Sequence, residues 1–237
     1  MKKYNKLDDK SYALGISLTL FLLEEKLKYV TKVYIHSAIN KNDVYDKIIN
    51  ICLKNNIPVE QNNKVFNILT NKENCFVIGE FNKYDTYITN NNHIVLVNPS
   101  NAGNLGTIIR SMVGFGINDL AIISPAVDIY DPKVIRASMG SFFKLNFKYY
   151  NDFNEYKNEF HDHLIYTFML QASKSLVKFE EKDKFSLVFG NEATGLPHEF
   201  LKIGEPLKII HSNEIDSLNL PMAVTIALYE VTKRHFN

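Results

Sequence analysis

Apolar residues follow two periods along the chain, and the alternation of these periods predicts an α/β protein. Positions three or four apart are apolar over residues 12–29 and 43–55, which predicts helices, whereas short continuous apolar runs over 30–36 and 76–79 predict strands. The same patterns predict further strands over 94–97, 120–123, 164–168, 186–189 and 206–210, and further helices over 65–69, 105–115, 132–140, 153–162 and 221–234. Alternation of this kind is typical of layered α/β folds.

A polar stretch from residue 81 to residue 92 interrupts the alternation and ends in three consecutive asparagines. Such a stretch is typical of a connection between domains, because it offers few apolar groups to a core. We therefore predict a small α/β domain over residues 1–85, a linker over 86–92 and a larger domain over 93–237. The 237-residue chain is long enough for two cores.

The most informative pattern is a β-loop-α-β unit over residues 94–123. Its loop, residues 98–104, is rich in Asn and Gly, which adopt special backbone angles and allow a ligand to approach closely. In the helix that follows, Arg110 lies opposite the apolar stripe, one turn from Gly106 and one turn from Gly114. Each interior glycine costs about 1 kcal/mol relative to alanine, which suggests that something binds or packs on that face. The alternative is a solvent-facing arginine on a surface helix.

Three predicted strands lead into unusual loops, over residues 98–104, 190–197 and 211–220. Open parallel sheets bind ligands beyond the carboxyl ends of their strands, so the three loops are candidates for one shared site. The chain has neither a G-x-G-x-x-G sequence nor a Walker loop, and an ordinary Rossmann or P-loop nucleotide site loses support.

Composition is that of an ordinary globular protein, with 46% hydrophobic residues and a formal net charge of +1, which neither demands nor excludes an RNA partner. Cys52 and Cys75 lie in apolar surroundings without metal-ligand spacing, which indicates buried thiols in a cytoplasmic protein that has no metal site. The apolar run over residues 13–23 has acidic flanks and no cleavage site, and it is too short to span a membrane. We expect a helix there and no membrane association.

Three motifs resemble the SpoU (TrmH) branch of the SPOUT RNA methyltransferases, and they occur in the order and spacing of that family. The first is Asn98-Pro-x-Asn101-x-Gly103-Asn104 with Arg110 and Phe115-Gly116; the second is Phe189-Gly190-Asn191-Glu192-x-x-Gly195-Leu196; the third is Ser217-Leu218-Asn219-Leu220 with Ala223 and a helix that ends in Tyr229-Glu230. The resemblance covers about residues 92–237. The front part looks like the ribosomal-protein-like α/β module with which many members bind RNA.

The resemblance implies a trefoil-knotted α/β catalytic domain that binds S-adenosylmethionine in the knot, forms homodimers and methylates the ribose 2′-hydroxyl of RNA. Composition or periodicity could not have indicated a knot, because knots are rare exceptions among folds. Carried over by motif, the cofactor pocket comprises Gly190, Glu192, Gly195, Ile210, Leu218 and Asn219. The catalytic set comprises Arg110, Asn104, Glu192, Ser217 and Asn219. The homodimer is expected to use the last helix and the helix over residues 105–115.

These residue types suit the reaction, because a ribose hydroxyl is a weak nucleophile whose developing negative charge needs stabilisation. A guanidinium stays protonated in proteins, so we expect Arg110 to hold a target phosphate and stabilise the alkoxide rather than act as a base. Ribosomal RNA is the expected substrate and transfer RNA the nearest alternative. A non-catalytic RNA-binding or ribosome-assembly factor is a competing hypothesis, and a nucleotide-binding α/β enzyme unrelated to RNA is a third.

Each assigned residue also has a simpler interpretation. Asn104, Ser217 or Asn219 could cap a helix, and Glu192 could be an exposed turn carboxylate. Ile210 and Leu218 could belong to the core, and Arg136 and Ser138 could lie on a surface helix rather than contact RNA. Two positions depart from the family pattern: Ala193 stands where members often have glycine, and His211 stands where many have proline.

Overall fold

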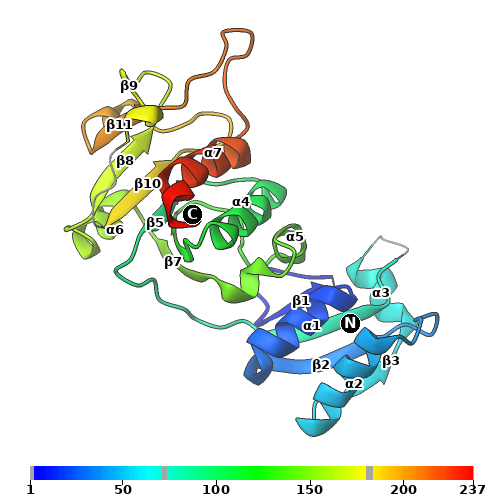
Figure 1. Ribbon diagram of the computed structural model, residues 1–237. Coiled ribbons are helices and arrows are strands. Elements are labelled where there is room, and N and C mark those ends of the chain that lie inside the picture. The colour runs from blue at the N-terminus through cyan, green and yellow to red at the C-terminus, as the bar shows by residue number, and fades with distance from the viewer. Residues whose placement is uncertain (1–2, 71–73, 180–183, 237) are drawn as a thin grey trace. The chain divides into compact units, whose positions relative to one another are not determined.

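The computed structural model describes residues 3–70, 74–179 and 184–236. The chain forms two compact units, one made of residues 1–85 and 128–144 and the other of residues 86–127 and 145–237 (Figure 1). Residues 128–144, which we had assigned to the second domain, thus pack with the first unit. The first unit is discontinuous in sequence as a result.

The first unit is built on a four-stranded sheet in the order β1-β4-β2-β3. Its strands are β1 (Lys10–Leu14), β2 (Val30–Ile35), β3 (Val59–Gln61) and β4 (Val77–Asn82), and its helices before residue 86 are α1 (Ile16–Glu25), α2 (Asp43–Lys54) and α3 (Asn63–Leu69). β4 is antiparallel to β1 and β2, while β3 is parallel to β2. Apolar side chains from the sheet and the helices form its core.

The predicted helix over residues 12–29 is wrong at its start, because residues 10–14 form strand β1. Gly15 separates the strand from α1 with φ 124°, a backbone angle that favours glycine. The side chain of Ser11 is buried and its Oγ donates to the carbonyl of Tyr130 at 2.5 Å. Tertiary pairing with β4 therefore overrides the apolar period at the front of this segment.

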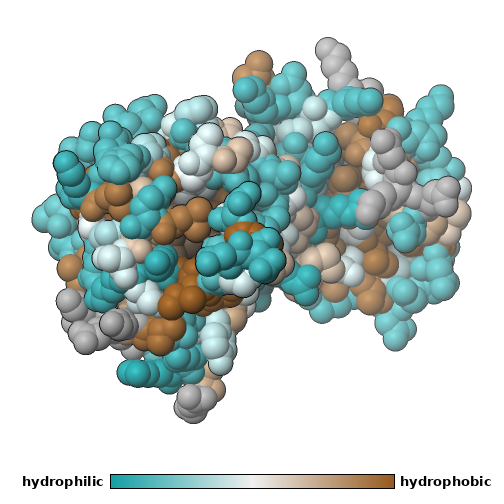
Figure 2. All heavy atoms as spheres, turned by 90° about the horizontal axis from the view of Figure 1, so that it is seen from above, coloured by the Kyte–Doolittle hydropathy of each residue, from teal (hydrophilic) through white to brown (hydrophobic). Residues whose placement is uncertain are grey.

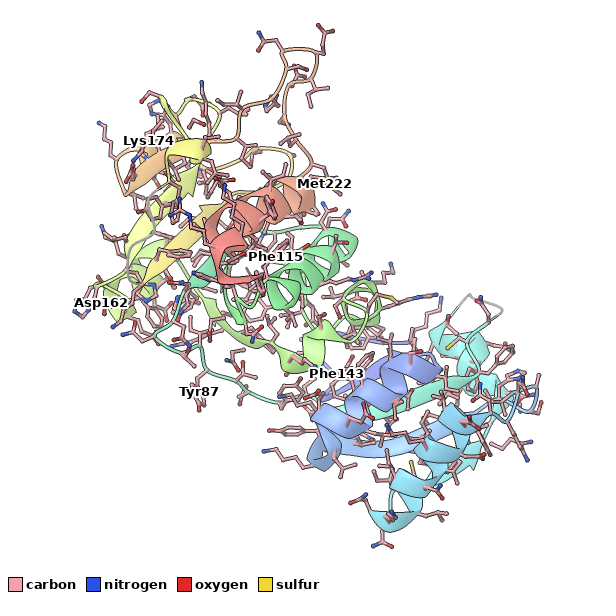
Figure 3. All side chains as sticks on the ribbon, in the orientation of Figure 1. Tyr87, Phe115, Phe143, Asp162, Lys174 and Met222 are labelled. Carbon is pink, nitrogen blue, oxygen red and sulfur yellow. The ribbon has the colours of Figure 1, made fainter. Side chains whose placement is uncertain are left out.

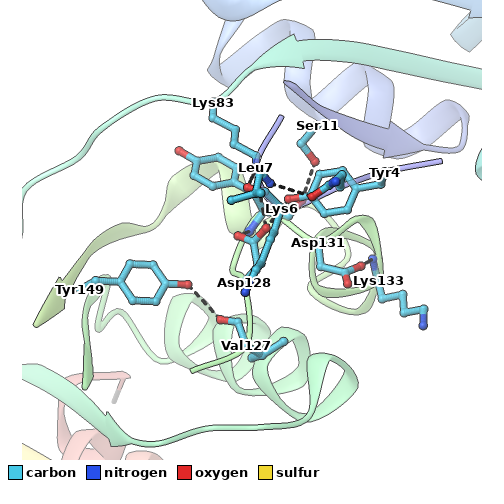
Figure 4. Close-up of polar contacts among 12 residues, drawn as sticks. Tyr4, Lys6, Leu7, Ser11, Lys83, Val127, Asp128, Asp131, Lys133 and Tyr149 are labelled. Atoms are coloured by element: carbon cyan, nitrogen blue, oxygen red, sulfur yellow. Dashed lines mark hydrogen bonds and ion pairs between the residues drawn. The ribbon is translucent and has the colours of Figure 1, made fainter. Parts of the chain in front are cut away.

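Residues 128–144 hold helix α5 (Pro132–Ala137) and the 3-10 helix η2 (Ser141–Lys144), and their aromatic side chains complete the core of the first unit. The rings of Phe143 and Phe81 meet edge to face at a centroid distance of 5.7 Å, and the Tyr130 hydroxyl donates to the Tyr84 carbonyl. Lys83 Nζ lies 3.7 Å from Asp128 (Figure 4). The first unit buries these rings only with residues 128–144 in place.

The second unit is built on a seven-stranded sheet in the order β7-β6-β5-β10-β8-β11-β9, and every neighbouring pair is parallel. Its strands are β5 (His93–Val97), β6 (Asp119–Ile123), β7 (Asn146–Tyr150), β8 (Leu164–Phe168), β9 (Lys174–Ser175), β10 (Phe185–Phe189) and β11 (Glu205–Lys208). Its helices are α4 (Ala102–Gly114), α6 (Phe153–Glu159) and α7 (Leu220–Thr232). The sequence patterns had not predicted β7 or β9.

Strand order decides which loops meet. β5 and β10 are neighbours in the sheet although their first residues, His93 and Phe185, lie 92 positions apart in the sequence. The loops that follow both strands therefore emerge at the same edge of the sheet, as expected for a site beyond the carboxyl ends of parallel strands. Helices α4 and α7 pack against each other. The trefoil knot implied by the family resemblance stays a prediction.

The opposite, amino-terminal edge of this sheet holds two buried histidines, His93 and His163, here called the histidine pair. Their ring centroids are 4.5 Å apart, and each ring hydrogen-bonds a buried hydroxyl: His93 Nδ1 lies 2.8 Å from Tyr156 Oη and His163 Nδ1 lies 2.9 Å from Ser186 Oγ. Burial lowers the pKa of both, and for His163 burial and the neighbouring His93 bring the pKa to about 4. The pair is thus neutral near pH 7.

No helix within residues 3–70, 74–179 and 184–236 is long and apolar enough to cross a bilayer.

Candidate functional site

The second unit contains a cavity of about 240 Å³ at the carboxyl ends of its central strands. Phe168 and Phe189, from the ends of β8 and β10, contribute apolar walls and stack with a ring-centroid distance of 4.3 Å. Residues 190–196 line it as well, and so do Lys208, His211, Ser217 and Leu218. Viewed from above, this unit shows apolar side chains gathered around a central hollow (Figure 2). An apolar cavity with a few polar groups suits a small amphipathic ligand.

Glu192 joins the loop over residues 98–104 to the cavity. Its Oε2 accepts from the Ser100 amide at 3.1 Å and from Ser100 Oγ at 2.8 Å, while its Oε1 accepts from the Asn101 amide at 3.1 Å and from Asn104 Nδ2 at 3.3 Å. Burial alone would raise the pKa of Glu192, but these donors and its own backbone amide outweigh it and hold the pKa below its usual range. Glu192 is therefore no free turn carboxylate, and two of the three predicted loops share one site.

The simpler interpretation of Asn104 as a helix cap is wrong. Asn101 occupies the N-cap of α4, and its Oδ1 accepts from the Asn104 amide at 3.0 Å. The helix begins at Ala102, three residues before the predicted start. The Asn104 side chain is consequently free to donate to Glu192.

Backbone geometry explains both glycines of the second motif. A Cβ on Gly190 would lie 2.1 Å from the carbonyl carbon of Gly195, so only glycine fits there. Gly195 has φ +67°, a left-handed conformation. Between them the side chain of Asn191 accepts from the Ala193 and Thr194 amides and donates to the Asn98 carbonyl at 2.8 Å. The extra methyl group of Ala193 is exposed and requires no left-handed backbone angle.

Some of the site residues predicted around the third loop line the cavity, and others do not. Ser217 and Leu218 line it, whereas Ile210 is 68% exposed and does not. Asn219 stands at the N-cap position of α7 without a side-chain capping bond, and it is not among the lining residues. The cofactor roles of Ile210 and Asn219 stay predictions.

Arg110 lies on the exposed side of α4, as the helical period predicted. Among the residues that the structure describes it makes no ion pair or side-chain hydrogen bond, and it does not line the cavity. Ser138, by contrast, has a structural role: its buried Oγ donates to the Ile135 carbonyl and accepts from the Phe142 amide, which links α5 to η2.

Sequence reasoning missed four residues that shape the site: Ser100, Asn101, Asn191 and Phe168. The first three are short polar residues in loops after strands, where such side chains commonly bond to backbone amides, so a signal was present. Phe168 carried no signal, because it reaches the site only through the pairing of β8 with β10, and local sequence patterns do not indicate strand order.

Comparison with known proteins assigns the chain to a family. The model of the SpoU rRNA Methylase family matches residues 91–229, which is more than half of the chain. The chain belongs to the SpoU rRNA Methylase family. This SpoU protein is 29% identical over 147 residues to an uncharacterized tRNA/rRNA methyltransferase of Synechocystis sp., covering 60% of this chain and 53% of that protein. It is 30% identical over 152 residues to a tRNA (cytidine-2′-O-)-methyltransferase of Methanocaldococcus jannaschii, covering 58% of this chain and 66% of that protein. The chain thus spans about half to two thirds of these two relatives.

The fold agrees with the family over both units. The SpoU methyltransferase AviRb from Streptomyces viridochromogenes, solved in complex with AdoMet, matches with a TM-score of 0.84 and 19% identity, covering 97% of this SpoU protein and 91% of that chain. The predicted fold class, an α/β SpoU fold with a parallel sheet preceded by a smaller α/β unit, is confirmed.

Proposed function

We propose that this protein transfers a methyl group from S-adenosylmethionine to a ribose 2′-hydroxyl of structured RNA, with ribosomal RNA as the substrate. The observation that carries the proposal is the set of hydrogen bonds from Ser100, Asn101 and Asn104 to Glu192, which brings two family motifs to one cavity. Relatives named as RNA 2′-O-methyltransferases support the reaction.

The cavity fits the cofactor in character. Phe168 and Phe189 offer apolar surface to a purine, while the backbone of residues 190–196 offers polar groups to its edge. S-adenosylmethionine supplies an activated methyl group on a sulfonium. Leu218 and Gly195 would hold it in place. The role of Glu192 is to fix the shape of the loop through its hydrogen bonds, not to balance the charge of the ligand.

Titration calorimetry with S-adenosylmethionine tests this assignment directly. We expect saturable binding that Leu218→Asn weakens at least tenfold, because the leucine lines the cavity. Leu53→Asn is the matched control, since Leu53 is 70% exposed in the first unit. No binding to the wild-type protein at millimolar cofactor would refute cofactor use and favour a non-catalytic RNA-binding factor.

Ribosomal RNA and transfer RNA are distinguished by mapping ribose methyl groups in RNA from a strain that lacks the gene. The proposal favours ribosomal RNA because the match to an rRNA methyltransferase from Sinorhizobium meliloti covers 97% of this chain, whereas a structure described by 2-OH methylation of C/U34 on tRNA covers 61%. A missing methyl group in transfer RNA with intact ribosomal RNA would reverse the assignment.

In this mechanism Arg110 holds a target phosphate and stabilises the forming alkoxide. Its exposure and its lack of an anionic partner among the described residues leave the guanidinium available for RNA. Arg110→Lys should nearly abolish turnover while S-adenosylmethionine binding stays normal, because a lysine cannot reproduce bidentate contact with phosphate. Near-normal turnover would remove Arg110 from the mechanism.

The first unit is proposed to bind the RNA. Residues 1–85 and 128–144 together carry 16 Lys and Arg against 12 Asp and Glu, whereas the remaining residues carry 11 against 14. A basic surplus attracts phosphate, and Arg136 of α5 contributes to it. Arg136→Gln should weaken RNA binding in a filter assay and reduce its salt dependence, whereas unchanged affinity would exclude this arginine.

The protein is proposed to act as a homodimer through α7. Met222, Ile226 and Tyr229 recur at helical spacing on that helix and are 56%, 41% and 56% exposed. Met222 lies at the start of α7 and Phe115 at the end of α4, with the rings of Phe115 and Tyr229 6.3 Å apart (Figure 3). Ile226→Asp should shift the mass measured by light scattering to that of a monomer, while Val177→Asp, at another exposed apolar position, should not.

A cytoplasmic location is also proposed. Cys52 and Cys75 are free and buried, and burial raises the pKa of each thiol to about 11, so neither is a reactive thiolate. Imaging of a fluorescent fusion tests the location.

A further inference from the structure

The cavity raises a question that the family motifs leave open, namely which group accepts the proton of the ribose hydroxyl. Three of its lining residues have ionisable side chains: Glu192, Lys208 and His211. Each can be judged by the bonds that it already makes and by the chemistry of its side chain.

Glu192 is a poor candidate. Both of its oxygens already accept hydrogen bonds, from the amides of Ser100 and Asn101 and from three side chains. Hydrogen bonds that stabilise a carboxylate also make it a weaker base, in agreement with its lowered pKa. Removing it from these partners would in addition release the loop over residues 98–104.

Lys208 and Arg110 are also poor candidates. A charged ammonium has three donors and no acceptor, and a guanidinium does not lose its proton in proteins. Lys208 lies at the end of β11 and lines the cavity, whereas Arg110 does not line it. The hydroxyl of Ser217, which also lines the cavity, can pass on a proton but cannot retain it.

His211 meets the requirements that the other groups fail. It follows β11, is partly buried and lines the same cavity as Glu192 and Ser217. Its Nδ1 lies 2.9 Å from the carbonyl oxygen of Ser212, which can only accept, so Nδ1 carries the proton in the neutral ring. Nε2 is then the atom with a free lone pair, and it makes no hydrogen bond with the described residues.

We propose that His211 is the general base of the methyl transfer, a role that rests on the proposed function. As the ribose oxygen bonds to the methyl carbon, the carbon–sulfur bond of the sulfonium breaks and its electron pair stays on sulfur. The O–H bond breaks and its proton passes to Nε2, which leaves a neutral thioether, a methylated ribose and an imidazolium. Glu192 and Lys208 are the charged groups that face the cavity with His211, one of each sign.

Single-turnover methylation tests the role, with radiolabelled S-adenosylmethionine and ribosomal RNA from a strain that lacks the gene. The rate of the wild-type protein should rise with pH and then level off, because the reaction needs an unprotonated base. His211→Asn, which can still donate to the Ser212 carbonyl, should be slower by about 10²–10⁴-fold and should lose that pH dependence. Its affinity for S-adenosylmethionine should stay within about threefold, and added imidazole should restore part of the rate of His211→Ala.

Two further measurements separate catalysis from structure. His198→Asn is the matched control, because His198 is exposed and does not line the cavity, and its profile should equal that of the wild type. Nitrogen-15 shifts of the labelled imidazole should show Nδ1 protonated and Nε2 bare in the neutral ring, and the reverse would overturn the proposal.

The outcomes distinguish the two claims. A wild-type protein that binds the RNA and the cofactor without methylating any RNA would refute the proposed function and this role with it. An active wild type with an equally active His211→Asn, at an unchanged pH profile, would refute only the role of His211.

Discussion

Replacement of Glu192 by glutamine tests whether one carboxylate holds the site together. Its two oxygens accept from the Ser100 amide and hydroxyl and from the Asn101 amide and Asn104 Nδ2. Glutamine keeps the length of the side chain but removes the charge and turns one oxygen into a donor. Whichever oxygen is replaced, at least two of the existing donors then face an NH₂ group.

The magnitude follows from those two lost bonds. A hydrogen bond contributes about 1 kcal/mol net, and the site is partly exposed, so the loss should be about 1–2 kcal/mol. That corresponds to roughly 5–30-fold faster exchange of the Ser100 and Asn101 amides through local opening of the loop. The midpoint of thermal unfolding should fall by about 2–8 °C if the loss extends to global stability.

Hydrogen exchange followed by NMR measures the effect at both amides, and Glu199→Gln is the matched control. Glu199 is exposed and its side chain makes no hydrogen bond with the described residues. Because the pKa of Glu192 is lowered in the folded protein, its contribution is present above the unfolded pKa of about 4.3 and is lost as the pH falls below it. The two proteins should therefore converge at acid pH. Exchange at Ser100 and Asn101 that matches the control would refute the reasoning.

Three further predictions concern stability. Gly190→Ala should abolish folding of the loop or destabilise the second unit by several kcal/mol, because the new Cβ would lie 2.1 Å from a backbone atom. Gly114→Ala has open space around its Cβ and should stabilise the protein by about 0.5–1 kcal/mol. Equal denaturation midpoints for the two variants would contradict this prediction. The folded pKa of the histidine pair is lowered, so its contribution is complete above pH 6.5 and is lost as the pH falls toward 4, and a urea titration across that range should show stability declining in the wild type and less so in His163→Gln. A chain of residues 1–85 alone should not fold, because it lacks three buried rings contributed by residues 128–144, each worth about 1.5–3 kcal/mol; a cooperative transition in that fragment by circular dichroism would refute the discontinuous unit.

Local sequence patterns alone predicted most of the strands and helices and the residue types of the site. Continuous apolar runs predicted the central strands of the parallel sheet, because a strand that is buried on both faces carries apolar side chains on both. Loops rich in Asn and Gly after those strands indicated the site, and motif spacing indicated the family. The helical period placed Arg110 on the exposed side of α4, where the structure has it.

Tertiary structure decided what local patterns do not encode. Ser11 and its neighbours form β1 because β4 offers a partner, and residues 128–144 pack with the first unit although the sequence pattern placed them in the second domain. Glu192 reaches Ser100 only because β10 lies beside β5, and only the fold shows that His211 of the third loop lines the same cavity as Glu192. Pairing between distant strands depends on the free energy of the whole sheet, whereas propensity and period report on one segment at a time.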